Sequence, residues 1–435
     1  MNILIITTWF PPDTAIAAVR PYMFAKYSRK AGHNVTVLRS GAINAKIDGH
    51  AYPELDINVY SYMGENSAAE RYRRGEAIQT AAPRKRKAAF LPDGIRNALI
   101  WVYELFAIFR NFREAADRFK LQKAWIDENR NQKFDVIFST YGELENVYAG
   151  KYAAEVFGCK WILDLRDPIA RKSLDKFWEY PIMKWLQKKA ILSADICTAV
   201  SNGSAVEISK GTEKDIITLY NGFDAAMWEA VPVPNDGILR FCYTGIMYKT
   251  QDASALFCAI RQLADAGKLD LKNIRFEYAG SDFEVFLTQA KPYGVEEILI
   301  NHGYVSRTEA YEIQCRSDIF LVLSWNIQHG RGVMPGKFYE GIRAGKPILS
   351  LLTGDTPYSE LNLLNQKYHY GFCYETCQEK EHFPALLNWL ETAYACKYTG
   401  KPIPYHPEPG FFADFCYKNL AKQLEALCLG LVEQH

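Results

Sequence analysis

The chain has 435 residues, and its 51 Lys and Arg residues balance 50 Asp and Glu residues to a net charge of +1. This length exceeds what a single hydrophobic core usually supports, so we expect two domains of roughly 200 residues each. The balanced charge excludes a general attraction to nucleic acid, and no nucleic-acid partner is expected. No apolar run reaches the roughly 20 residues that a membrane-spanning helix needs.

The sequence favours the cytoplasm as the compartment of this protein. The chain begins with MNILIITTWF, which has no basic segment before its apolar run, so a secretory signal is not expected. Among the ten cysteines the closest pair, Cys373 and Cys377, fits neither a CxxC redox motif nor paired zinc ligands. We therefore expect reduced and mostly buried cysteines.

Short β-rich runs alternate with helical patterns along most of the chain, which is typical of parallel sheets in α/β domains. The first series of expected strands is 2–8, 34–38, 134–140, 160–164 and 195–200. A second series follows at 239–244, 274–279, 298–301, 318–323 and 347–351. Between the two series, the proline-rich stretch VPVPNDG at 231–237 marks a linker.

One segment departs from this alternation. The basic cluster PRKRKAAF at 83–90 precedes the nearly all-apolar stretch ALIWVYELFAIF at 98–109. Two interpretations remain open: a buried helix beside a solvated basic loop, or an interfacial contact with an anionic membrane surface.

The stretch MPGKFYEGIRAGKPILSLL at 334–352 indicates a loop, a short helix, a turn and a strand. The start of that helix lies beside Lys337, where a phosphate group would bind. A final helix is expected after residue 410, with one apolar face that needs a surface to cover it. That face comprises Phe412, Cys416, Leu420, Leu424, Leu427 and Leu431.

Several motifs, in this order, resemble the GT-B glycosyltransferases of the family-4 type. They are FPPD with Arg20 and AGHNVTVL, DLRDPI at 164–169, YNGFD at 220–224, YTGIMYK at 243–249, GYVSRTEAYEIQCRSDIFLVLS at 303–324 and GKFYEGIRAGKPIL at 336–349. The resemblance spans nearly the whole chain and is weakest over 48–133.

The resemblance implies an α/β fold of the GT-B type, with two Rossmann-like domains facing a cleft. The first domain, 1–220, would bind the acceptor, and a linker at 221–236 would lead to the nucleotide-sugar domain at 237–406. The segment 407–435 would form a helix that crosses back to the first domain.

The same resemblance implies the site residues. Lys337 and the backbone at Gly336 would hold the diphosphate of the donor, and Glu340 would accept hydrogen bonds from the nucleotide ribose. The full set implied for the donor is Gly245, Tyr248, Lys249, Gly332, Met334, Pro335, Gly336, Lys337 and Glu340. For Lys249, Lys337 and Glu340 the alternative is an ordinary solvated side chain.

Asp164, Arg166 and Asp167 follow the end of a strand, which points them toward the expected cleft. Asp167 is the candidate for contacting the attacking acceptor hydroxyl. In the alternative, Asp164 and Arg166 pair with each other to fix the loop. Residues 139–143 are expected to line the same wall.

Two positions depart from the family pattern. Residues 15–18 read AIAA where paired glycines are usual, which leaves less room for a close backbone approach. Gly332 replaces the first glutamate of the E-x7-E pair whose second member is Glu340. The chain also has no D-x-D tripeptide, which favours departure of the diphosphate without a metal ion, and no cofactor is expected.

The sequence therefore predicts a metal-independent glycosyltransferase that moves a hexose or similar sugar, with retention, from a nucleotide diphosphate sugar to an acceptor hydroxyl. The expected partners are that donor, a glycan or lipid-linked glycan of cell-surface polysaccharide synthesis, and the inner face of an anionic membrane. Two alternatives are a nucleotide-sugar epimerase of the same fold and a non-catalytic glycosyltransferase-like binding protein.

Overall fold

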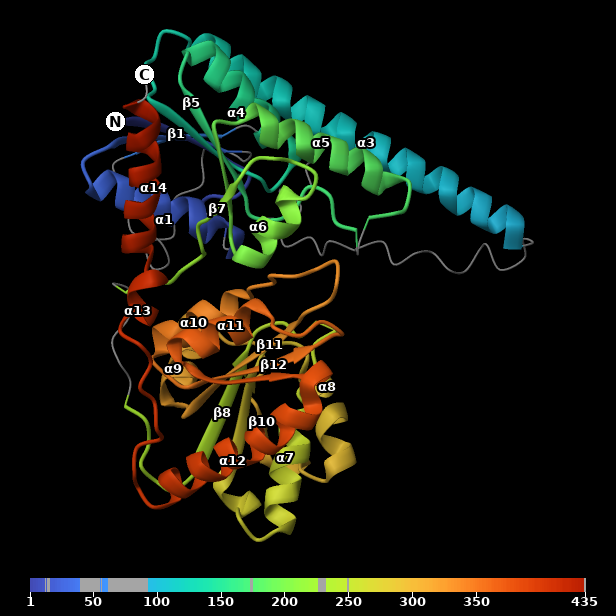
Figure 1. Cartoon of the computed structure of the whole chain (residues 1–435), viewed down its shortest axis with the longest axis vertical. Helices are drawn as coiled ribbons and strands as arrows, with labels where there is room; N and C mark the ends of the chain where they lie inside the picture. Colours follow the sequence, from blue (N-terminus) through green and yellow to red (C-terminus); the bar gives the residue numbers. More distant parts are fainter. Residues whose placement is uncertain are drawn as a thin grey trace.

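A computed structural model describes residues 1–11, 13, 16–39, 55, 57–61, 93–172, 175–225, 232–248 and 250–433, with backbone alone at 61 and 93–108. This part of the chain forms two α/β domains, one above the other in Figure 1. Each domain is a parallel sheet with helices on its faces, so the expected pair of Rossmann-like domains is confirmed.

The first domain holds a seven-stranded sheet in the order β3-β2-β1-β4-β5-β6-β7. Its strands are β1 (Asn2–Thr7), β2 (Asn34–Arg39), β3 (Asn58–Ser61), β4 (Val136–Thr140), β5 (Lys160–Leu165), β6 (Ile196–Ala199) and β7 (Ile216–Thr218). The strand order reverses between β1 and β4, and in open α/β sheets ligands bind beyond the strand ends at such a point.

The second domain holds a six-stranded sheet in the order β10-β9-β8-β11-β12-β13. Its strands are β8 (Leu239–Thr244), β9 (Ile274–Ala279), β10 (Leu299–Asn301), β11 (Ile319–Trp325), β12 (Ile348–Thr353) and β13 (Gly371–Glu375). The reversal here lies between β8 and β11, where Ile319 pairs with Phe241. All ten predicted strands are present, whereas β3, β7 and β13 were not predicted.

Helices connect the strands and cover the sheets. In the first domain they are η1 (Ile16–Ala18), α1 (Val19–Lys30), α3 (Asp93–Glu128), α4 (Leu144–Phe157), α5 (Glu179–Ser193) and α6 (Asn202–Ser209). In the second they are α7 (Ser254–Asp265), α8 (Phe283–Ala290), α9 (Arg307–Arg316), α10 (Gly336–Ala344), α11 (Glu360–Tyr368) and α12 (Glu379–Tyr398), with short 3-10 turns η2 (Leu271–Asn273), η3 (Lys291–Tyr293), η4 (Glu296–Ile298) and η5 (Thr376–Gln378). Two more, α13 (Gly410–Asp414) and α14 (Tyr417–Val432), follow.

Most of the basic and apolar segment lies outside the residues whose side chains the structure describes. Residues 83–90 lie outside the described residues. Residues 98–109 belong to α3, whose side chains are described only from Phe109 onward. In the described part of the chain, no helix combines the length and apolar character needed to cross a membrane.

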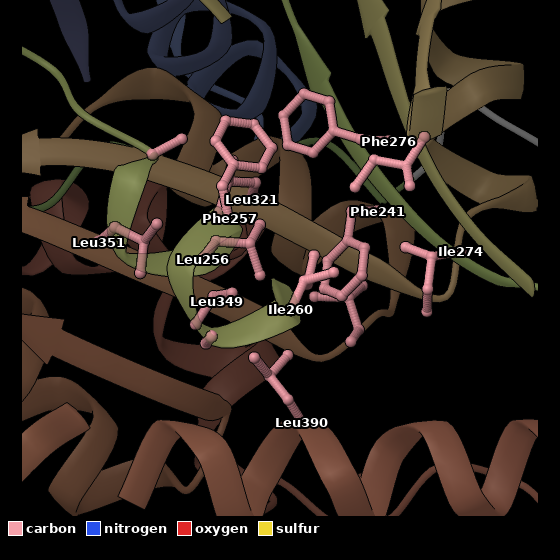
Figure 2. Close-up of a cluster of buried hydrophobic side chains, with 14 of the residues drawn as sticks. Phe241, Leu256, Phe257, Ile260, Ile274, Phe276, Leu321, Leu349, Leu351 and Leu390 are labelled. Atoms are coloured by element: carbon pink, nitrogen blue, oxygen red, sulfur yellow. The ribbon is translucent and has the colours of Figure 1, made fainter. Parts of the chain in front are cut away.

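The central strands are buried on both faces, which explains why they are continuous apolar runs in the sequence. Figure 2 shows one such core, where α7 and the second sheet pack together through Phe241, Phe257 and Phe276. The centres of the Phe257 and Phe276 rings are 5.5 Å apart. These packed layers fix the positions of the loops at the strand ends.

The helix α14 returns to the first domain, as expected, and packs along α1 (Figure 1). Its buried residues Leu420, Leu424, Cys428 and Leu431 join the core that includes Ile3, Ile5 and Phe24. The sequence predicted one continuous helix after residue 410. This prediction is wrong in detail, because Phe415 and Cys416 interrupt the helix between α13 and α14. As a result Phe411, not Phe412, is the fully buried residue of α13.

The chain crosses between the domains twice, and the two crossings are hydrogen-bonded to each other. The amide of Phe223 donates to the carbonyl of Phe415 at 2.9 Å, and the amide of Tyr417 donates to the carbonyl of Phe223 at 3.0 Å. Beside them, the buried guanidinium of Arg20 donates to the carbonyls of Leu219 and Tyr220 at 2.9 and 2.7 Å. The first crossing is thereby tied to α1.

Candidate functional site

Lys337 and Gly245 meet at the strand-order reversal of the second sheet. Lys337 is the second residue of α10, and its Nζ lies 5.2 Å from the centre of the Tyr243 ring on β8. A Cβ on Gly245 would lie 2.5 Å from that Nζ, and the φ of Gly245 is +105°. The positive φ favours glycine at 245, and the absence of a side chain there leaves room for the Nζ of Lys337.

The charge on Lys337 is not neutralised by a neighbouring acid in the described part of the chain, where no carboxylate lies within ion-pair distance of it. The residue stands in the first turn of α10, where backbone N–H groups lack the usual partners within the helix. A cation and a helix N-terminus together favour an anionic group at this place.

Glu340 lies one turn further along α10 and is held by the neighbouring elements. Its Oε2 accepts a hydrogen bond from Nε2 of Gln314 on α9 at 2.9 Å, and the same nitrogen donates to Oγ1 of Thr244 at 2.8 Å. Arg343 donates to Oε1 of Gln314 at 3.3 Å. Gln314, which the sequence did not single out, therefore fixes the Glu340 carboxylate beside the end of β8.

The remaining predicted donor residues differ in their surroundings. Tyr248 is 58% exposed, and its ring centre lies 6.4 Å from that of Trp325 at the end of β11. Met334 is buried with the apolar residues of α10, so a ligand there would meet its backbone only. Pro335 is the N-cap residue of α10. Lys249 lies outside the described residues.

The loop that replaces the usual paired glycines approaches the start of α10 from the first domain. A Cβ on Gly336 would lie 3.5 Å from Cγ2 of Ile16, which is 65% exposed. Ile16 therefore stands opposite the N-terminus of α10, next to the position of Lys337. Ala15 lies outside the described residues.

Gly332 lies in a contact between the two domains. Its carbonyl accepts a hydrogen bond from Oγ of Ser201 at 2.6 Å, and its φ is +77°. A Cβ on Gly332 would lie 2.4 Å from the amide nitrogen of Ser204, and a Cβ on Gly203 would lie 2.7 Å from Cα of Gly332. The two glycines thus allow the backbone of the loop before α10 to touch the start of α6.

Glu360 strengthens the same domain contact. Its carboxylate accepts hydrogen bonds from the amides of Asn202 and Gly203 at 3.1 and 2.9 Å, and from the hydroxyl of Tyr220 at 2.6 Å. Burial, with the nearby Glu360 charge, raises the pKa of Tyr220. A residue of α11 therefore caps α6 of the other domain, a role that no local sequence pattern indicates.

The alternative in which Asp164 and Arg166 pair with each other is wrong. Asp164 is fully buried and accepts hydrogen bonds from Arg20 at 2.7 and 3.0 Å and from Thr198 at 2.7 Å. Burial opposes ionisation of Asp164, but Arg20 and the hydrogen bonds outweigh it and lower its pKa. Arg166 instead donates to the carbonyl of Ala17 at 3.2 Å.

Asp167, the predicted acceptor-side residue, is in contact with solvent. Its side chain is 63% exposed, and its Oδ2 lies 3.6 Å from Nε of Arg166. Gly142 lies close by, since a Cβ there would be 3.7 Å from Nη2 of Arg166 and 3.3 Å from Oγ1 of Thr8. The ends of β1, β4 and β5 thus come together, as the strand-order reversal requires.

Ser139 does not belong to this group. Its hydroxyl accepts a hydrogen bond from the indole of Trp161 at 2.8 Å inside the core. The expected wall at 139–143 is therefore reduced to its last residues, which begin with the half-buried Tyr141.

The described cavities lie away from these residues. One of about 170 Å³ is lined by Asp252, Tyr293 and Glu379 among others, and one of about 320 Å³ is lined by Phe372, Trp389 and Ile403 among others. Among the described residues, no group of three or more His, Cys, Asp or Glu could hold a metal ion. The candidate site is consequently defined by side chains that converge at the sheet ends.

Comparison with known proteins gives no match to a protein-family model or to a curated relative. Solved structures do match over the whole chain. They include the apo form of the lipopolysaccharide outer core galactosyltransferase WaaB, with 14% identity, 99% of both chains covered and a TM-score of 0.58. Sucrose-phosphate synthase from Thermosynechococcus elongatus matches with 12% identity, full coverage of both chains and a TM-score of 0.60.

A third structure is HepE of Anabaena in complex with UDP and glucose. It has 13% identity and a TM-score of 0.56, and the match covers 99% of this chain and 100% of that chain. These similarities show that the chain has the GT-B fold.

Proposed function

We propose that this protein is a glycosyltransferase that moves a sugar from a nucleotide diphosphate sugar to an acceptor hydroxyl. The observation that carries the proposal is the meeting of Lys337, Gly245 and Glu340 at the strand-order reversal of the second sheet. Structures of similar fold are in complex with UDP, with UDP-glucose and with UDP-2-fluoro glucose, which supports a nucleotide-sugar donor.

In this proposal the donor diphosphate lies against Lys337 and the first amides of α10. As the bond between the anomeric carbon and the diphosphate oxygen breaks, negative charge develops on the leaving group. The lysine and the helix N–H groups stabilise that charge most in the transition state. The acceptor oxygen forms the new bond to the anomeric carbon and passes its proton to an oxygen of the departing diphosphate, while Asp167 contacts that hydroxyl. Glu340 accepts hydrogen bonds from the ribose.

The finer features of the proposal follow the motifs. We propose retention at the anomeric carbon, a hexose or similar sugar, and departure of the diphosphate without a metal ion. The acceptor would be a glycan or lipid-linked glycan of the cell surface, handled in the cytoplasm at the inner face of the membrane.

The test begins with melting curves in the presence of UDP-, GDP-, ADP- and dTDP-sugars, since a ligand that binds the folded state raises the melting temperature. The sugar that stabilises the protein is then followed by NMR, and release of the nucleoside diphosphate is measured. Release with transfer or hydrolysis of the sugar supports the proposal. Formation of an epimer without acceptor would establish an epimerase, and binding without any turnover would establish a binding protein.

Glu340→Ala is expected to raise the Kd for the nucleotide sugar by roughly tenfold or more, because hydrogen bonds to a charged acceptor contribute about 1.5–3 kcal/mol. Titration calorimetry of both proteins with the stabilising sugar gives the value. The matched control is Glu379→Ala, which removes an exposed carboxylate from α12 of the same domain. An unchanged Kd in the Glu340 variant would exclude this carboxylate from the nucleotide site.

A further inference from the structure

The outward face of α5 carries large apolar side chains. Ile182 is 46% exposed, and Trp185 and Leu192 are each 57% exposed. Phe177, two residues before the helix, is 87% exposed. In Figure 1, α5 runs alongside α3 in the first domain. Apolar residues that gather on one exposed face indicate an interaction surface, whereas single exposed ones do not.

The helical spacing shows that these residues form one face. Ile182, Trp185, Lys189 and Leu192 are three or four residues apart and so lie on one side of the helix. The other side is the one that the domain needs, because Ala190 and Ile191 are buried in its core. These outward apolar side chains remain exposed and do not belong to the buried core of this domain.

The charges on this segment are strongly one-sided. Residues 171–193 contain six Lys and Arg residues against two Asp and Glu residues, although the whole chain is nearly neutral. Both acids lie at or before the first residue of the helix, where Asp175 pairs with Arg171. Lys188 and Lys189 are exposed, and Nζ of Lys189 lies 4.5 Å from the centre of the Trp185 ring.

We propose that this face of α5, together with Phe177, binds the surface of an anionic membrane. A helix that lies in the headgroup region inserts aromatic and aliphatic side chains, while its lysines reach the lipid phosphates. Trp185 and Lys189 place an aromatic ring and a cation next to each other on this face. The complementary charge favours anionic lipid over a second copy of the chain, which would bring like charges together.

The surface also adjoins the candidate site along the chain. The loop that leaves the end of β5 carries Asp167, and ten residues later it reaches Phe177 and then α5. A lipid-linked acceptor held in the membrane would therefore meet the first domain on the side where its polar end can approach Asp167. This inference rests on the proposed function, but the binding itself can be measured without a donor.

The test is sedimentation of the full-length protein with vesicles of phosphatidylcholine, with and without phosphatidylglycerol. We expect binding only to the vesicles with phosphatidylglycerol, and weaker binding as salt is added. The double variant Trp185→Ala/Leu192→Ala should bind these vesicles roughly tenfold or more weakly than the wild type does. Vesicle binding by the variant Lys188→Gln/Lys189→Gln should depend on salt much less than binding by the wild type does.

The matched control is Tyr398→Ala/Leu429→Ala, which removes exposed apolar side chains from α12 and α14 and should bind as the wild type does. Melting curves establish that the variants are folded. Release of nucleoside diphosphate in the absence of vesicles is measured on the same preparations. Vesicle binding without any turnover would contradict the proposed function, but it would support the proposal that α5 binds a membrane.

Three results would overturn the inference. The first is wild-type protein that stays in the supernatant at low salt. The second is equal binding by the wild type and the Trp185 double variant, with loss on changing Arg84, Lys85, Arg86 and Lys87 to Ser, which would assign the contact to the basic cluster. The third is a dimer in light scattering that the Trp185 double variant dissociates, without any vesicle binding.

Discussion

Lys337→Ala is expected to lower kcat/KM for the nucleotide-sugar donor by roughly a hundredfold or more, the scale on which one preorganised electrostatic group contributes. In the described part of the chain no acid neutralises this lysine, and it projects beside Gly245 at the end of β8. Its charge is therefore available to the leaving diphosphate. Steady-state rates of nucleoside diphosphate release, measured on the purified variant, give the ratio.

The control for this experiment is Lys380→Ala, which removes an exposed lysine from α12 in the same domain and should leave kcat/KM unchanged. Melting curves establish that both variants are folded. If Lys337→Ala retains the kcat/KM of the wild type, the lysine does not belong to the site.

Gly332→Glu is expected to abolish most of the activity and to lower the free energy of unfolding by roughly 2 kcal/mol or more. The position has a φ of +77°, and a Cβ there would lie 2.4 Å from the backbone nitrogen of Ser204. Neither atom can move without parting the loop before α10 from α6. The variant therefore should not behave as one with a restored E-x7-E pair.

A second glycine separates the two causes of this effect, which are the strain of a positive φ and the collision of the new side chain with α6. Gly303 also has a positive φ, of +67°, but a Cβ there would meet nothing within 4 Å. Gly303→Ala should lose only the roughly 1 kcal/mol of backbone strain, whereas Gly332→Ala should lose more and also reduce turnover. A clear gain in turnover for Gly332→Glu would identify 332 as a vacated catalytic position.

The strands and the domain pair could be predicted because buried parallel strands are continuous apolar runs separated by turn residues. The meeting of Lys337 and Gly245 could also be expected, since both stand at motif positions next to strand or helix ends. The distance between the Nζ of Lys337 and Gly245 could not be predicted, because it depends on how α10 packs on the sheet.

The wrong alternative for Asp164 and the missed role of Glu360 have a common physical cause. Asp164 could have paired with the nearby Arg166, but its partner Arg20 is 144 residues away. The carboxylate of Glu360 bonds to amides 157 and 158 residues away, in the other domain. Long-range pairs of this kind follow from the packing of whole elements, which one sequence does not specify residue by residue.

The return of α14 to the first domain sets an order of events during synthesis. The first domain lacks Leu420, Leu424 and Leu431 until α14 has left the ribosome, because these side chains complete its core. The second domain is continuous between the two crossings and is translated before α14. Since domains fold as units, the domain that comes second in the chain can finish folding first. Until then the nascent first domain exposes the apolar face of α1 that α14 later covers.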